Sequence, residues 1–304
     1  MIRRKRGKSL WSPSLAGTGW GESTFAEMSW DKSRSAAFRW AIAGLVVGVL
    51  VSLVAFAPAA WLARAVASAT GQRLLLADAR GSIWSGSAVL VLTGGPGSRD
   101  AAALPGRLAW TLQPRGLALE AVLSQACCLH GDVTVNWTPG FGGFTATLTP
   151  PGDWVGQWPA AWLAGLGTPW NTLRLGGTAR LLSSGLMIES MQGRWRLAGG
   201  LDIELMHASS RLSTLDTLGS YRLSVQGEPL NAARGGASTG TAQIRLSTLG
   251  GALLLIGNGS WGLAGLRFQG EASAVDPNDA ALGNLLNIIG RRDGARSVIS
   301  IGEP

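Results

Sequence analysis

Two adjacent cysteines with a nearby histidine come closest, by residue type and spacing, to a chemical site. Cys127 and Cys128 are neighbours, and His130 follows two residues later. A structural zinc site needs four ligands, and adjacent cysteines chelate one ion poorly. The other histidine, His207, lies far along the sequence. We therefore expect no metal site, and two alternatives stay open: a strained disulfide in an oxidising compartment, or two mostly buried thiols at a strand edge.

A glycine-rich motif at residues 257–262 (GNGSWG) matches the pattern of a dinucleotide-binding loop. In that fingerprint the motif opens a helix, because the helix N-terminus holds the pyrophosphate. Here the following segment, Leu263–Ala274, has the pattern of a strand. We therefore expect residues 257–262 to form a hairpin turn, with no cofactor bound.

Catalytic constellations are missing from the sequence. A serine nucleophile would need His130 or His207 as its base, and neither lies in a recognisable nucleophile motif. Paired carboxylates are also scarce. The sequence therefore predicts a non-catalytic protein with no catalytic residues, no cofactor and no evident small-molecule substrate.

The positive charge is concentrated at the N-terminus. The chain has a net charge of +8, and residues 1–39 hold eight of its 26 basic residues but three of its 18 acidic ones. Nucleic-acid binding needs a clustered basic surface, and the remaining residues offer none in sequence. A basic tail beside a membrane segment fits anionic lipid or a role in fixing topology. We therefore expect no nucleic-acid partner.

An uncharged, mostly apolar segment runs from residue 40 to residue 63, bounded by Arg39 and Arg64. As a helix it would rise about 36 Å, enough to cross a hydrocarbon core of roughly 30 Å. Pro58 comes late enough to kink or end the helix without spoiling the span. A cleaved signal peptide is the alternative, although its apolar region is typically shorter. We expect residues 1–39 to be a disordered cytoplasmic tail, with either Met1 or Met28 as its start.

The basic N-terminal tail predicts the orientation of the chain in the membrane. Lys32, Arg34 and Arg39 on one side are balanced by three arginines soon after the span. Long domains translocate largely regardless of their charge, so the short basic tail decides. We expect a single-pass protein of the bacterial inner membrane, with its N-terminus in the cytoplasm and residues 64–304 in the periplasm.

The body has the pattern of a β protein. Short runs that alternate apolar with polar or small residues recur between glycine-rich turns, which predicts strands with one face in a core. The runs are 87–92, 107–112, 132–137, 145–148, 201–205, 221–225, 243–247 and 266–274. The predicted fold is mainly β: one transmembrane helix, then a twisted or curved antiparallel sheet with one or two short helices.

Two segments are predicted to form the short helices of the β domain. Residues 158–166 predict a short surface helix. At the C-terminus, Asp276 suits an N-cap and Pro277 the first helical position. An apolar stripe follows at helical spacing, and Gly290 fits a left-handed C-cap. The stripe consists of Leu282, Leu285, Leu286 and Ile289. We expect this helix to pack against the sheet.

The order of several short motifs over residues 38–302 resembles the protein N family of the type II secretion system, also called general secretion pathway protein N. The motifs are GSIWSG at 81–86, GTPWNT at 167–172, the run from Gly259 to Gly270, the capped helix and the closing GRRDG at 290–294. The resemblance implies a non-catalytic accessory subunit in the inner membrane that works with other secretion components in the inner membrane and periplasm. The β pattern is also similar to AsmA-type bridge proteins, and this implies the alternative of a groove-like sheet that handles lipid.

Overall fold

The computed structural model describes residues 20–230, 241–262, 265–276 and 280–302, in two compact units that meet between Phe56 and Ala57. The first unit contains helix α1, Trp20–Ala55. Within it, Phe38–Ala55 has a mean hydropathy of 2.1 and is long and apolar enough to cross a membrane. The structure therefore contains the apolar helix that the sequence predicts.

The boundaries of this region differ from the sequence expectation. Helix α1 begins at Trp20, inside the segment expected to be a disordered tail, while residues 1–19 lie outside the described residues. The helix ends at Ala55, and a separate helix α2, Ala59–Ala69, follows Pro58. Pro58 has an extended backbone with a ψ of 148°, so the helical conformation does not continue from α1 into α2.

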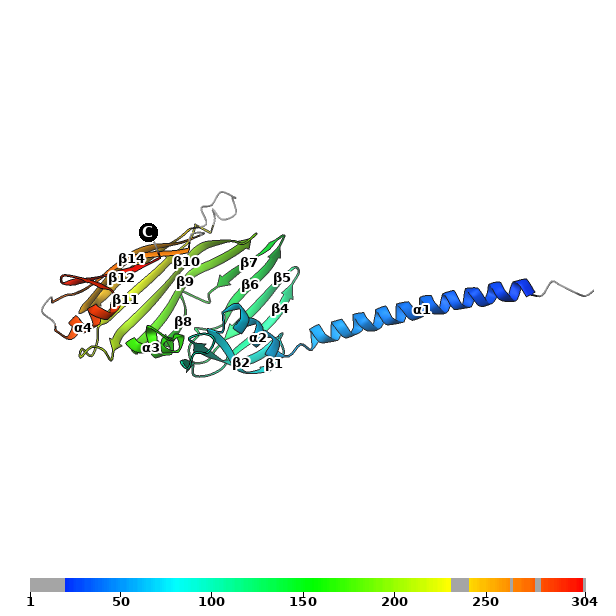
Figure 1. Cartoon of the computed structure of the whole chain (residues 1–304), viewed down its shortest axis with the longest axis horizontal. Helices are drawn as coiled ribbons and strands as arrows, with labels where there is room; N and C mark the ends of the chain where they lie inside the picture. Colours follow the sequence, from blue (N-terminus) through cyan, green and yellow to red (C-terminus); the bar gives the residue numbers. More distant parts are fainter. Residues whose placement is uncertain (1–19, 231–240, 263–264, 277–279, 303–304) are drawn as a thin grey trace, which may run out of the picture. The chain divides into compact units, whose positions relative to one another are not determined.

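The second unit is one antiparallel sheet of sixteen strands (Figure 1). Its main path runs β1-β2-β4-β5-β6-β7-β9-β10-β11-β12-β13-β14-β16-β15, while β3 pairs with β2 and β8 pairs with β9. The strands are β1 Leu74–Gly81, β2 Ser85–Thr93, β3 Ala101–Ala103, β4 Leu108–Arg115, β5 Ala118–Ser124, β6 Val133–Gly140, β7 Gly143–Thr149, β8 Trp154–Pro159, β9 Leu175–Met191, β10 Arg194–Ser210, β11 Gly219–Gln226, β12 Ala242–Gly251, β13 Leu253–Gly262, β14 Gly265–Ala274, β15 Arg291–Asp293 and β16 Arg296–Ile301.

Each of the eight predicted strand segments overlaps an observed strand, so the predicted mainly β fold is confirmed. Because successive strands along the path are antiparallel, the turns after β1, β4, β6 and β9 and the junction of β13 with β14 lie at one end of the strands. We call this the hairpin end. The connections after β2, β5, β10 and β12 lie at the opposite end.

Besides α2, three short helices accompany the sheet in the described part of the chain: the 3₁₀-helix η1, Ala160–Leu166, helix α3, Trp170–Leu173, and helix α4, Ala280–Ile289. The predicted helix at 158–166 is therefore a 3₁₀-helix that begins after strand β8. Helix α4 confirms the predicted C-terminal helix. Pro277, which was expected at its first helical position, lies outside the described residues. The C-cap prediction for Gly290 was wrong, because Gly290 has no positive φ; a Cβ there would instead lie 2.4 Å from the carbonyl oxygen of Val298.

The glycine motif at 257–262 is not a turn, contrary to the prediction. It forms the second half of β13, and the strand β14 follows it. The glycines make room for an aromatic ring, because a Cβ on Gly257 or Gly259 would lie 2.4 Å or 2.9 Å from the ring of Phe268. No helix opens at this motif, so its spacing reflects packing of Phe268 in the sheet.

Candidate interaction surface on the sheet

Alternation along the strands gives the sheet one apolar side. Side chains of successive strand residues point to opposite faces, so the register of paired residues identifies which ones share a face. Cross-strand pairs such as Leu76 with Leu90, Ala146 with Ile188, and Ile203 with Leu223 place apolar residues together from the first strands to the last. We call this the apolar face; its members include Leu76, Leu90, Trp110, Leu112, Ala121, Val135, Trp137, Phe144, Ala146, Ile188, Trp195, Leu197, Ile203, Leu205, Leu223, Leu246, Leu255 and Phe268.

Helices cover the two lateral parts of the apolar face. Helix α2 packs over β1, β2 and β4, where Ala59, Ala88 and Trp110 form a buried cluster. Helix α4 packs over the late strands, where Leu285 is 1% exposed among a second cluster that includes Tyr221. Burial raises the pKa of Tyr221, whose hydroxyl donates a hydrogen bond to the carbonyl oxygen of Leu253. These clusters are the hydrophobic cores of the domain.

Between these clusters, the apolar face presents large side chains to solvent. Trp137 is 40% exposed, Trp195 49% and Ile203 37%. Phe144 joins the two tryptophans, with ring centroids 6.2 Å from Trp137 and 5.7 Å from Trp195. Aromatic pairs at such distances hold one another in place even where one side is open. Strands β6, β7, β9 and β10 therefore position a preformed aromatic cluster that no described helix covers.

A small pocket lies next to this cluster. Its lining includes Ile188, Trp195 and Leu197 from β9 and β10, and Ala242 and Trp261 from the hairpin-end parts of β12 and β13. Because Trp195 and Trp261 share the pocket, the apolar face is continuous from the early strands to the late ones at the hairpin end. The lining is mostly apolar, as in sites that bind apolar ligand groups.

The opposite face is polar. It carries threonine, asparagine and paired charges along its middle strands, and apolar residues elsewhere, among them Leu75, Val91, Leu182, Leu254, Ile256 and Val298. Glu204 of β10 is buried, with its side chain 8% exposed, and it accepts a hydrogen bond from Nε of Arg222 at 3.0 Å. Buried charges of this kind require a partner. The ion pair therefore secures two central strands from the polar side.

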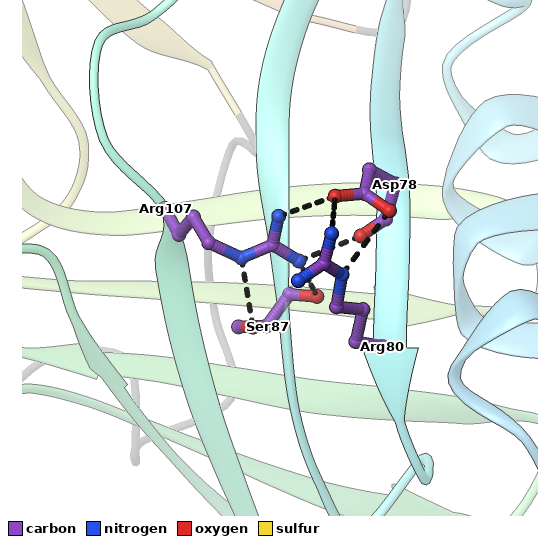
Figure 2. Close-up of polar contacts among 4 residues, drawn as sticks. All are labelled: Asp78, Arg80, Ser87 and Arg107. Carbon is purple, nitrogen blue, oxygen red and sulfur yellow. Dashed lines mark hydrogen bonds and ion pairs between the residues drawn. The ribbon is translucent and has the colours of Figure 1, made fainter.

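A cluster of charged side chains secures the first strands (Figure 2). Arg107 donates to Asp78 Oδ2 at 2.7 Å and to the Asp78 carbonyl oxygen at 2.6 Å, and its Nε donates to Ser87 Oγ at 3.0 Å. Asp78 has a φ of +49° within a register shift of β1. The Arg107 guanidinium, followed by Arg80, lowers the pKa of Asp78 below its ordinary value of 3.8. The cluster links β1 and β2 to the residue that precedes β4.

The residues singled out from the sequence lie apart from the apolar face. The structure joins Cys127 and Cys128 in a disulfide within the turn after β5, with Cys127 exposed and Cys128 7% exposed. His130 stacks on Trp154 with ring centroids 4.2 Å apart, while His207 lies in β10 with a φ of +50°. Among the described residues, no three His, Cys, Asp or Glu side chains gather where they could hold a metal.

Sequence reasoning did not locate the apolar face. Strand alternation predicted a buried side for each segment, but which parts of that side remain uncovered depends on where α2 and α4 pack. The signal available in the sequence was the spacing of Trp110 and Trp137, which register places on the same face.

The structure therefore defines a β-sheet protein with an apolar helix long enough to cross a membrane and an open sheet whose apolar face is only partly covered by the described helices. The family model described as type II secretion system (T2SS), protein N, matches residues 72–299. The chain belongs to this family and is a component of the type II secretion machinery. Neither the curated proteins nor the solved structures contain a match to it.

Proposed function

We propose that this chain is a non-catalytic accessory subunit of the type II secretion system that docks on other secretion components through its apolar face. The uncovered aromatic cluster of Trp137, Phe144 and Trp195 carries the proposal. Protein interfaces are enriched in such aromatic anchors at their centres. Family membership supports partners within the same machine. The proposal places these partners in the inner membrane and the periplasm.

The proposal includes a location. The apolar part of α1 anchors the chain in the bacterial inner membrane, the short N-terminal tail stays in the cytoplasm, and the β domain lies in the periplasm. A reporter active in the periplasm, fused after Pro304, tests this arrangement against a fusion at the N-terminus. We expect activity from the C-terminal fusion alone; activity at neither end, or at the N-terminus alone, would place the sheet in the cytosol and end the proposal.

Deletion of the gene tests the proposed role in secretion. Deletion of the gene should lower secretion of the system's substrates while the lipid composition of the envelope stays unchanged. A plasmid carrying the wild-type chain should restore secretion. Normal secretion together with altered envelope lipids would reject the accessory role.

The second candidate is an AsmA-like envelope protein that handles lipid on the same face. One observation favours it: the apolar face is continuous at the hairpin end, and within the described residues no helix closes it over the middle strands. Full-length protein extracted with a mild detergent would then retain phospholipid through purification. Mass spectrometry distinguishes the candidates, because retained lipid supports the lipid role and co-purified secretion subunits without lipid support docking.

A further inference from the structure

The hairpin end of the β domain presents apolar side chains at its turns. Leu117, in the turn between β4 and β5, is 88% exposed, and Phe141, in the turn between β6 and β7, is 104% exposed. Trp195 lies next to the turn between β9 and β10, and Trp261 and Leu266 flank the junction of β13 with β14; these three are 40–49% exposed. Leu117 and Phe141 are too exposed to contribute to the hydrophobic core.

The chain enters the β domain at this same end. Ala57, the first residue of the second unit, accepts a hydrogen bond from the backbone nitrogen of Ile83 at 2.9 Å, and Pro58 bridges to Ser82. Ser82 and Ile83 form the turn between β1 and β2, one of the hairpin-end turns. Since the apolar helix ends at Ala55, two residues before Ala57, the covalent link from the membrane segment reaches the sheet at its hairpin end.

Residues around the link and the turns suit a bilayer interface. Trp61, close to the link on α2, is 47% exposed, and tryptophan is enriched at the level of lipid headgroups. Arg194 and Arg267 lie beside the turns, and no described residue forms an ion pair with either. Arginine at such a position attracts anionic headgroups, and exposed apolar side chains insert into the boundary of the acyl region.

We propose that the hairpin end of the β domain rests on the surface of the bilayer that anchors the chain, with Leu117 and Phe141 inserted among the lipid headgroups. This rests on the membrane anchoring proposed above. The apolar face then opens towards the membrane along its hairpin-end edge. The opposite end also exposes apolar residues, Leu249 and Val275, but the chain does not reach the membrane segment there.

The test measures contact with lipid at the two ends. The full-length chain, with Cys127→Ser and Cys128→Ser to leave a single introduced thiol, carries Phe141→Cys labelled with a polarity-sensitive dye. The matched control is Leu249→Cys, an exposed apolar residue at the opposite end. Both proteins are reconstituted into nanodiscs of phosphatidylethanolamine and phosphatidylglycerol, with and without doxyl-labelled lipid as a quencher.

We expect the dye at Phe141 to shift its emission to the blue and to lose emission with the doxyl lipid, while the dye at Leu249 does neither. If the discs hold the chain but the dye at position 141 is not quenched, the proposal is overturned while the membrane anchoring stands. The exposed residues at the hairpin-end turns would then be assigned to contact with a protein partner. Equal quenching at both positions would also overturn the proposal, because both ends of the β domain would then contact the bilayer. A chain that does not enter the discs would remove the anchoring on which the proposal rests.

Discussion

A single charge placed on the apolar face tests whether this face is a binding surface or a hidden part of the core. Ala146 of β7 has Trp137 and Ile188 as its cross-strand neighbours, and the next residue, Thr147, points to the polar face. The side chains of Ala146 and Thr147 are both half-buried. A carboxylate on an uncovered face keeps most of its hydration. Ala146→Asp should therefore lower the free energy of unfolding by about 1 kcal/mol or less, and Thr147→Asp should do the same.

Binding should respond differently. A ligand or partner that covers the face would strip water from an unpaired carboxylate, and the effective penalty for a buried ion is several kcal/mol. A penalty of about 3 kcal/mol corresponds to a loss of affinity of roughly a hundredfold. Ala146→Asp should therefore abolish the function of the face, whether that is secretion or lipid retention, and Thr147→Asp should preserve it.

Two measurements are needed for each variant. Urea unfolding of the full-length protein, followed by tryptophan fluorescence, gives stability, and complementation of a gene deletion together with mass spectrometry of retained lipid gives function. If Ala146→Asp loses about 3 kcal/mol or more while Thr147→Asp stays folded, the face is covered in the free protein and the reasoning is refuted. Wild-type secretion and lipid content in a stable Ala146→Asp variant would refute it equally.

Three further outcomes follow from the structure. Leu285→Ala, under α4, should cost about 2–5 kcal/mol in urea unfolding, because it leaves a cavity in a buried cluster; an effect below that range would mean that α4 is not docked. Asp78→Asn should destabilise at neutral pH, and its difference from wild type should shrink as the pH falls below about 5, because Arg107 and Arg80 depress the pKa of the folded carboxyl. A pH-independent difference in unfolding free energy would contradict that origin. Mass spectrometry of the protein isolated from cells with thiols blocked should find Cys127 and Cys128 unalkylated and the mass lower by two hydrogens; alkylated cysteines would favour the alternative of buried thiols.

Local patterns predicted the parts of this fold that depend on local physics. Segments such as Asp132–Trp137 and Tyr221–Val225 alternate strictly, so their strands could be placed from the sequence. The stripe of Leu282, Leu285 and Leu286 likewise predicted a helix with one buried side, and these residues are at most 2% exposed. Periodicity carries this information because it reflects which side of an element meets the core.

Features that depend on distant neighbours were not predictable in the same way. Strands β9 and β10 extend for 17 residues each, through glycines that look like turn residues. The motif at 257–262 resembled a turn because its glycines serve Phe268, which lies on the next strand. The ion pair between Asp78 and Arg107 joins residues 29 positions apart, and charge patterns in the sequence do not indicate such pairing.

The uncovered face follows from an architecture with an incomplete second layer. A sheet with one apolar side has to bury it against another layer. Helices α2 and α4 supply that layer over the first and last strands, and their clusters contain the buried Trp110 and buried leucines such as Leu253 and Leu285. Over β6, β7 and the hairpin-end parts of β9 and β10, the described chain supplies no helix. The side chains there nevertheless include Trp137, Phe144 and Trp195, whereas the opposite face of β7 carries Thr145 and Thr147. Extended apolar surface of this kind on a folded domain marks a site of interaction. In the proposed function another molecule supplies the missing part of the second layer, and the charge at Ala146 is placed where that molecule would bind.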